Sequence, residues 1–212
     1  RVQILSNKNE NTKFYNKKNL MKYSNKRLQI ENFTVQSIAK KYGTPAYCYS
    51  FERLKTNIIN FKKNFKSFSP LVCFAVKSNT NVNIINEIKK FGLGADVVSL
   101  GELMIALKAG INPKKIVFSG VGKTSSELSY AIDKKILLIN AESQSEIKEI
   151  DKIAKLRKKK VSIGIRINPN TDAKTLKQIS TGKKENKFGV NEKTFFDLVA
   201  FCKKSKNIEL KC

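Results

Sequence analysis

One lysine closes a run of apolar residues, a position where a primary amine can do chemistry. Residues 70–79 read PLVCFAVKSN, and at a period of two the small residues Cys73 and Ala75 share a face with Lys77. An amine on such a face, enclosed by the fold, would be partly removed from water, which lowers its pKa. A lysine of this kind can form a Schiff base with an aldehyde, so Lys77 is the first candidate site residue.

Two further charged residues occupy comparable faces of later strand candidates. Asp96 lies in GADVVS, and Arg166 lies in VSIGIRINP on the face that also carries Gly164. Because polar groups at the carboxyl ends of parallel strands converge at one rim, we expect Lys77, Asp96 and Arg166 to meet around a ligand. Taken singly, each has an ordinary structural explanation: a strand-end lysine, a turn aspartate and an ion-paired arginine.

A fourth candidate lies in a polar stretch that could hold an anion. Residues 179–189 read ISTGKKENKFG, where Ser180, Thr181 and Gly182 offer hydroxyl and amide groups. An amine for an aldehyde, charged partners and a phosphate site are together what pyridoxal phosphate requires. The alternative interpretation of this stretch is a simple surface loop.

The elements that must position these residues alternate regularly along the chain. Apolar strand candidates lie near 71–76, 95–98, 116–119, 136–140, 161–167 and 208–212. Amphipathic helix candidates lie at 51–65, 81–91, 101–109, 125–134, 143–159 and 191–204. This alternation predicts an α/β fold with a parallel sheet. An open sheet would normally carry a glycine-rich phosphate loop after its first strand, but KSNTNVN has no glycine, so a barrel of the (β/α)8 kind is favoured.

Three helix starts are marked by the spacing of a capping box. Ser99 to Glu102, Thr124 to Glu127 and Ser143 to Glu146 each place a hydroxyl three residues before a glutamate. The pattern predicts helix caps directly after strands. It also predicts that Glu102 is a cap rather than a catalytic carboxylate.

Composition limits the remaining function classes. The chain has 42 Lys and Arg against 17 Asp and Glu, a formal charge of +25, but the lysines are spread along helix surfaces without the pattern of a nucleic-acid module. We therefore expect neither a nucleic-acid nor a membrane partner. The four cysteines form no C-x-x-C pair and the chain has no histidine, which predicts reduced thiols, no metal site and a cytoplasmic location.

Several motifs together resemble one enzyme family. YGTPAYCYS, FAVKSN, GLGADVVSLGEL, KIVFSGVGKT, INAESQSE, IRINPNTDAKT and the stretch at 179–190 follow one another in unbroken order. This order is similar to the N-terminal half of the diaminopimelate decarboxylases, which belong to the fold-type III pyridoxal-phosphate decarboxylases. FAVKSN is common to that superfamily, whereas GVGKT and ISTG followed by KFG favour the diaminopimelate enzymes.

The resemblance implies a fold, a cofactor and a reaction. The expected fold is part of a (β/α)8 barrel of the alanine racemase and ornithine decarboxylase type, working as a homodimer. Lys77 would hold pyridoxal 5'-phosphate as the aldimine lysine, with Asp96, Arg166 and Ser180 also binding the cofactor. The reaction implied is conversion of meso-diaminopimelate to L-lysine and CO2, the last step of lysine biosynthesis.

The resemblance also implies boundaries and alternatives. From their polar, Asn- and Lys-rich, unpatterned sequence, residues 1–20 are expected to be a disordered lead or upstream translation. The resemblance makes 21–48 a segment of a second, β-rich domain and 49–212 the first part of the barrel. About half of the family's length is absent, so we expect this piece alone to be inactive. The alternatives are a sister decarboxylase acting on ornithine, arginine or carboxynorspermidine, and a non-catalytic barrel relative. Leu176 stands where the family carries a histidine against the cofactor ring.

Overall fold

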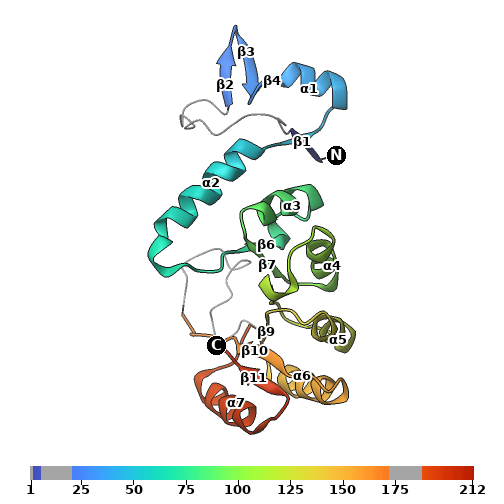
Figure 1. Cartoon of the computed structure of the whole chain (residues 1–212), viewed down its shortest axis with the longest axis vertical. Coiled ribbons are helices and arrows are strands. Elements are labelled where there is room, and N and C mark those ends of the chain that lie inside the picture. The colour runs from blue at the N-terminus through green and yellow to red at the C-terminus, as the bar shows by residue number, and fades with distance from the viewer. Residues whose placement is uncertain (1, 6–20, 172–187) are drawn as a thin grey trace. The chain divides into compact units, whose positions relative to one another are not determined.

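The computed structural model describes residues 2–5, 21–171 and 188–212, and these fall into two compact units, 1–70 and 71–212 (Figure 1). The predicted boundaries at 20/21 and 48/49 concern the domains of the whole protein and stay predictions. In the described part of the chain, no helix is long and apolar enough to cross a membrane. All four cysteines are free thiols, as predicted.

The first unit contains short elements that the sequence pattern did not predict. The strands β2 (Met21–Ser24), β3 (Arg27–Ile30) and β4 (Phe33–Thr34) form an antiparallel sheet. The turn between β2 and β3 consists of Asn25 and Lys26, both at positive φ (51° and 58°). Two such residues make the type I′ turn that suits a two-residue hairpin. Asn-Lys is a weak signal for this turn because it lacks the usual glycine.

The same unit carries one parallel strand pair and two helices. Strand β1 (Val2–Leu5) pairs with β5 (Tyr47–Ser50), and the helices are α1 (Val35–Tyr42) and α2 (Phe51–Asn64). A 3-10 turn, η1 (Lys66–Phe68), follows α2. Helix α2 confirms the amphipathic segment predicted at 51–65.

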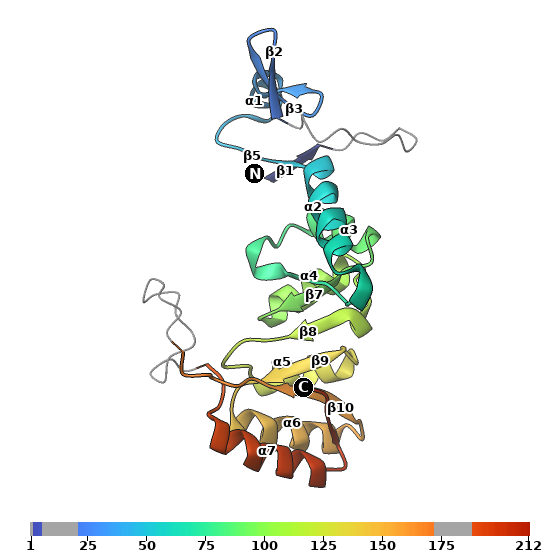
Figure 2. The ribbon, with the colours of Figure 1, turned by 90° about the vertical axis from the view of Figure 1, so that its left-hand side faces the viewer.

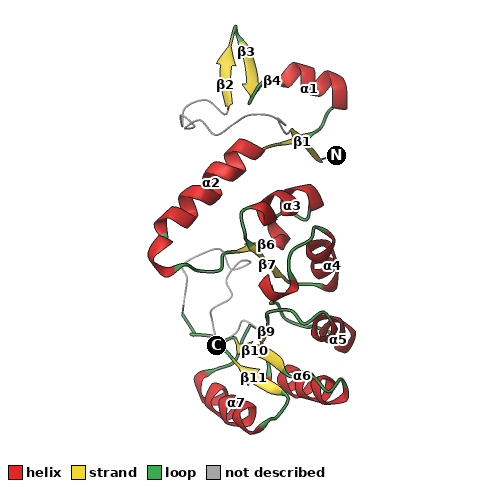
Figure 3. Ribbon diagram, viewed as in Figure 1, coloured by secondary structure: helices red, strands yellow, loops and turns green. Residues whose placement is uncertain are grey.

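The second unit is the predicted parallel sheet with its helices (Figures 2 and 3). Its six strands are β6 (Cys73–Ala75), β7 (Gly94–Val97), β8 (Ile116–Phe118), β9 (Leu138–Ala141), β10 (Val161–Ile165) and β11 (Ile208–Leu210). The helices are α3 (Val82–Lys90), α4 (Leu100–Lys108), α5 (Ser125–Asp133), α6 (Gln144–Leu156) and α7 (Glu192–Lys204), with 3-10 turns η2 (Val76–Ser78) and η3 (Pro113–Lys115).

Spatial order in this sheet equals chain order, from β6 to β11. In a doubly wound sheet the order of the strands across the sheet reverses at a switch point. No such reversal of strand order occurs among these six strands. In Figure 1 the helices α3 to α6 follow one another along one side of the strands. The α/β fold with a parallel sheet is therefore confirmed, and its order is the one that successive strands of a barrel have.

The two faces of the sheet differ in burial as the alternation predicted. On the helix-facing side Phe118, Ile139 and Ile163 are fully buried, and the register pairs Phe118 with Ile139 and Ile139 with Ile163. The opposite face is partly exposed and bears Asp96, which pairs with Val117 across β7 and β8. Parallel neighbours in register share a face, so the polar residues form rows on the side away from the helices.

The predicted helix caps are present, with one difference in geometry. Thr124 and Glu127 form the reciprocal capping box. At the other two sites the cap serine accepts from the glutamate N–H, but the carboxylate reaches one residue further back: Glu102 accepts from Val98 N–H, and Glu146 accepts from Glu142 N–H. Glu102 therefore satisfies one backbone donor, Val98 N–H, just before α4, and acts as a cap as predicted.

Glu127 also joins two neighbouring helices, and this makes its charge a stability determinant. Backbone N–H groups of Thr124 and Leu100, with the Thr124 hydroxyl, hold the pKa of Glu127 below its ordinary value of 4.5. A lowered folded-state pKa stabilises the fold fully above the unfolded value, and the contribution is lost as pH falls through the folded value. We expect Glu127→Gln to be less stable than the native protein above pH 4.5, with the difference shrinking as the pH falls below it.

Urea unfolding between neutral pH and the acid limit of solubility measures this difference. Glu87→Gln is the matched control, because the contact of Glu87 within the described residues is an i,i+3 pair with Lys90, whose side chain is 57% exposed on α3. Parallel pH profiles for the native protein and Glu127→Gln would contradict the assignment.

Candidate active site

A pocket of about 610 Å³ opens at the carboxyl ends of the strands in the second unit. Its lining consists of residues from the ends of β6 to β10 and the loops that follow them: Lys77, Asp96, Val98, Ser119, Gly120, Val121, Asn140, Glu142, Ile165, Arg166 and Phe188. Three of the four predicted site residues, Lys77, Asp96 and Arg166, are thus brought together. The fourth, Ser180, lies outside the described residues, as do Thr181, Gly182 and Leu176.

Lys77 reaches the pocket from a tight turn rather than from the strand itself. Strand β6 ends at Ala75, and Lys77 is the middle residue of η2. The turn is closed by Asn79 N–H to Val76 O (3.0 Å) and Ser78 Oγ to Ala75 O (2.7 Å). Lys77 is exposed in this chain, so the enclosure expected from the sequence is not provided by the described residues.

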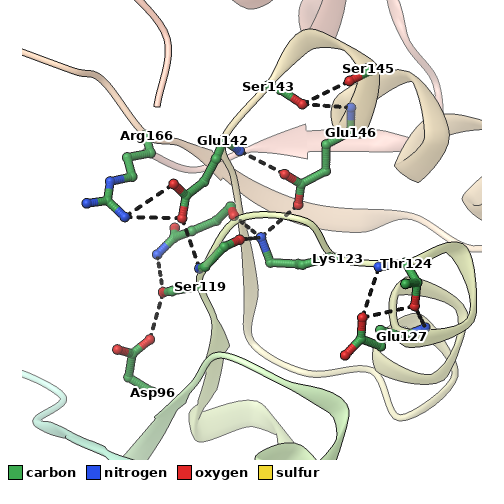
Figure 4. Close-up of polar contacts among 12 residues, drawn as sticks. Asp96, Ser119, Lys123, Thr124, Glu127, Glu142, Ser143, Ser145, Glu146 and Arg166 are labelled. Atoms are coloured by element: carbon green, nitrogen blue, oxygen red, sulfur yellow. Dashed lines mark hydrogen bonds and ion pairs between the residues drawn. The ribbon is translucent and has the colours of Figure 1, made fainter. Parts of the chain in front are cut away.

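Asp96 is the end of a hydrogen-bonded chain across three strands. Its Oδ1 accepts from Ser119 Oγ at 2.7 Å, and Ser119 Oγ accepts from Asn140 Nδ2 at 3.0 Å (Figure 4). A serine hydroxyl has one proton, so donating it to the carboxylate leaves its lone pairs for the asparagine amide. These two hydrogen bonds therefore fix the orientation of the Asp96 side chain, with Ser119 and Asn140 each donating toward it.

Arg166 is held by a carboxylate that the sequence interpretation had not singled out. Its Nη1 lies 3.2 Å from both carboxylate oxygens of Glu142, a residue that is buried as a whole, at 5% exposure. The Arg166 guanidinium carbon also lies 5.0 Å from the ring centroid of Phe188. Two contacts on different sides fix the plane of the guanidinium.

A closed ring of hydrogen bonds supports Glu142 from behind. Glu142 Oε1 accepts from Gly120 N–H (2.9 Å), and Gly120 O accepts from Lys123 Nζ (2.6 Å). Lys123 Nζ donates to Glu146 Oε1 (2.7 Å), and Glu146 Oε2 accepts from Glu142 N–H (3.0 Å), which closes the ring (Figure 4). We call these four residues, Gly120, Lys123, Glu142 and Glu146, the rim ring. It ties the loop after β8 to the loop after β9.

The charges around the pocket are balanced within its described lining. Lys77 and Arg166 are cationic, and Asp96 and Glu142 are anionic. The strongly positive surface of the chain therefore does not extend into the pocket, and its described side can supply directed donors and acceptors rather than an excess of positive charge.

Several pocket residues were missed although their position in the sequence carried a signal. Ser119, Asn140 and Glu142 stand at the ends of β8 and β9, the same place that Asp96 and Arg166 occupy in their own units. Polar residues in the last positions of a strand or directly after it are the sequence signal that these three share. Phe188 is brought in by the Gly189 turn at φ 77°, for which no strand or helix pattern gave a signal.

Comparison with known proteins shows a family that matches most of this chain. The family described as pyridoxal-dependent decarboxylase, pyridoxal binding domain, matches residues 51–211. A diaminopimelate decarboxylase of Helicobacter pylori strain J99 is 48% identical over 177 residues, which are 84% of this chain and 44% of that protein. The Aquifex aeolicus diaminopimelate decarboxylase is 40% identical over 190 residues, 90% of this chain and 45% of the relative.

Solved structures give the same result at the level of the fold. The H. pylori diaminopimelate decarboxylase complexed with L-lysine has a TM-score of 0.80 at 46% identity, over 82% of this chain and 44% of that one. A diaminopimelate decarboxylase from M. jannaschii has a TM-score of 0.82 at 34% identity, and the match covers 90% of this chain and 46% of that one. The chain spans less than half the length of the relatives it matches.

The rim ring depends on a buried charge pair, and its removal has a predictable effect. The Lys123 and Glu146 side chains are 1% and 8% exposed. Glu146→Gln keeps the shape but leaves the Lys123 ammonium buried without a counter-charge, so we expect unfolding free energy to drop by about 3 kcal/mol. Urea unfolding measures the change.

Glu149→Gln is the matched control on the same helix. Glu149 pairs with Lys152, whose side chain is 69% exposed, and accepts from Ser125 Oγ, so its loss should cost less than about 1 kcal/mol. Equal losses for the two variants would show that Lys123 is not held by its ion pair.

Proposed function

This chain belongs to the family of pyridoxal-dependent decarboxylases, and from this membership we propose that it is the N-terminal part of a diaminopimelate decarboxylase. The proposed reaction converts meso-diaminopimelate to L-lysine and CO2. The observation that carries the substrate assignment is the similarity at 40–48% identity to relatives of that name, one of them solved with L-lysine. The reaction belongs to the whole protein, of which this chain spans part.

The described pocket has the donor set that pyridoxal phosphate needs at its aldehyde end. Lys77 supplies the amine, and the volume of about 610 Å³ is in the range of cofactor sites. Gly164 allows the lining residue Asn140 to pack closely against β10, because a Cβ at Gly164 would lie 2.6 Å from Asn140 Oδ1. With pocket charges balanced, the phosphate needs donors from elsewhere, for which Ser180 remains our candidate.

Each residue of this chain has a proposed task at the site. When bound, the cofactor supplies a pyridinium ring that accepts the electron pair left by departing CO2. Lys77 would hold the cofactor through its amine, and the same amine would be placed to move a proton near the reacting centre. Asp96 and Arg166 line the cofactor, and their contacts to Ser119 and Glu142 keep them from rotating away.

The remaining parts of the proposal concern the whole protein. Residues 49–212 would form the first part of a (β/α)8 barrel, and 21–48 would join a second, β-rich domain. Ordering of the chain in sequence from β6 to β11 supports a barrel. We also propose a homodimer in the cytoplasm, on the basis of the family resemblance, with the substrate as the only other partner.

The first test addresses the lysine. Lys77→Ala in the full-length protein should abolish the visible absorption that pyridoxal phosphate acquires on binding and lower kcat by more than about a thousandfold. Lys152→Ala is the control, because Lys152 lies exposed on α6 away from the pocket lining. A Lys77→Ala protein with an unchanged spectrum and normal turnover would exclude this assignment.

The second test addresses the substrate. The full-length protein is assayed for CO2 release from meso-diaminopimelate, ornithine, arginine and carboxynorspermidine at equal concentrations. We expect kcat/KM for meso-diaminopimelate to exceed kcat/KM for each of the other three substrates by at least about a hundredfold. Discrimination of this size is expected where buried polar groups hydrogen-bond the second amino-acid centre, which the other substrates lack. Preference for another substrate would identify a sister decarboxylase, and cofactor binding without turnover of any would identify a non-catalytic relative.

A further inference from the structure

We propose that Glu142 is a positioning residue: it fixes the Arg166 guanidinium at the pocket so that the free edge of this group meets an anionic cofactor. The inference rests on the proposed function for the identity of that cofactor. It concerns a residue of the pocket lining whose carboxylate is almost fully buried against Arg166. Its effect would pass through Arg166.

Within the Arg166 guanidinium, one nitrogen contacts Glu142, while the other nitrogens lie on the side of the pocket. Nη1 alone contacts both oxygens of Glu142, at 3.2 Å each, and in Figure 4 only one guanidinium nitrogen is turned toward that carboxylate. The Glu142 side chain is 2% exposed, whereas the Arg166 side chain is 37% exposed. As far as the described residues go, the donors on Nε and Nη2 are therefore left available on the accessible side of the group.

The direction of control follows from the rim ring. Glu142 is fixed at its carboxylate by Gly120 N–H and at its backbone by Glu146. Both partners belong to the buried ring around Lys123, so the carboxylate cannot follow a moving arginine. Among the described residues, the Arg166 side chain is supported by Glu142 and the Phe188 ring, so we infer that it takes its orientation from Glu142.

Balance of charge gives the pair a second consequence. A buried carboxylate is stable only with compensating donors, which here are an amide and a guanidinium. Because Glu142 already neutralises Arg166, the arginine contributes direction rather than net charge. A positioning role therefore predicts that the orientation of the Arg166 guanidinium affects cofactor affinity more than the net charge of the Glu142–Arg166 pair does.

The test measures cofactor affinity in a double-mutant cycle on the full-length protein after removal of its cofactor. Glu142→Gln places an amide NH2 against either Gly120 N–H or Arg166, and Arg166→Met removes the guanidinium. We expect each single variant to raise the Kd for pyridoxal phosphate about tenfold, and the double variant to be no weaker than Arg166→Met, since the two act as one unit. Glu149→Gln should bind as the native protein does.

A purely structural role for Glu142 would give a different pattern. It would lower thermal stability without coupling to Arg166, so the unfolding midpoint of every cofactor-free variant is recorded beside the Kd. Multiplied losses in the double variant, or native affinity in Glu142→Gln, would overturn the inference. If Glu142→Gln does not fold, Glu142→Asp takes its place in the cycle: it keeps the charge but shortens the reach, so its native affinity would equally overturn it.

The outcome also separates this inference from the proposed function. A native protein that takes up no pyridoxal phosphate overturns both. A native protein that binds the cofactor while Glu142→Gln binds it equally well overturns the positioning role alone. Conversely, the double-mutant cycle measures cofactor affinity, so its result does not depend on which amino acid the enzyme decarboxylates.

Discussion

The buried ammonium of Lys123 is the constraint on which the pocket depends. An ammonium has three protons, and here they go to Gly120 O, Asn140 O and Glu146 Oε1, which removes the penalty of taking the charge out of water. Gly120 and Asn140 lie at two successive strand ends and Glu146 lies in the first turn of α6, so one side chain sets the separation of these three segments. The wall that carries Ser119 and Glu142 is thereby built before any ligand arrives, which is the condition for precise recognition.

Charge pairing separates the interior of this site from the rest of the surface. The chain as a whole carries a formal charge of +25, but the described pocket lining holds two cations and two carboxylates, and the Arg166 guanidinium is paired with Glu142. A general positive field would attract any anion. Fixed, neutralised donors instead select by shape and direction, which suits a site that must hold one cofactor in one orientation.

The parallel sheet and the meeting of Lys77, Asp96 and Arg166 could be predicted because alternating apolar patterns and strand ends are local signals. The N-terminal hairpin was missed because its Asn25-Lys26 turn adopts positive φ without glycine. Glu142 was missed because its role comes from tertiary contacts with Gly120 and Arg166, and a single glutamate between strand and helix also suits a cap. The exposure of Lys77 could not be foreseen from the period of β6, since the strand ends two residues earlier.

The helix starts are joined to one another as well as capped. Leu100 N–H of α4 donates to Glu127 of α5, and Ser125 Oγ of α5 donates to Glu149 of α6. Repeated strand and helix units that touch only through apolar faces can fray one at a time from an end. Polar links between successive units oppose this fraying, so backbone amides from α4 to α6 should exchange with deuterium as one cooperative block rather than in order along the chain.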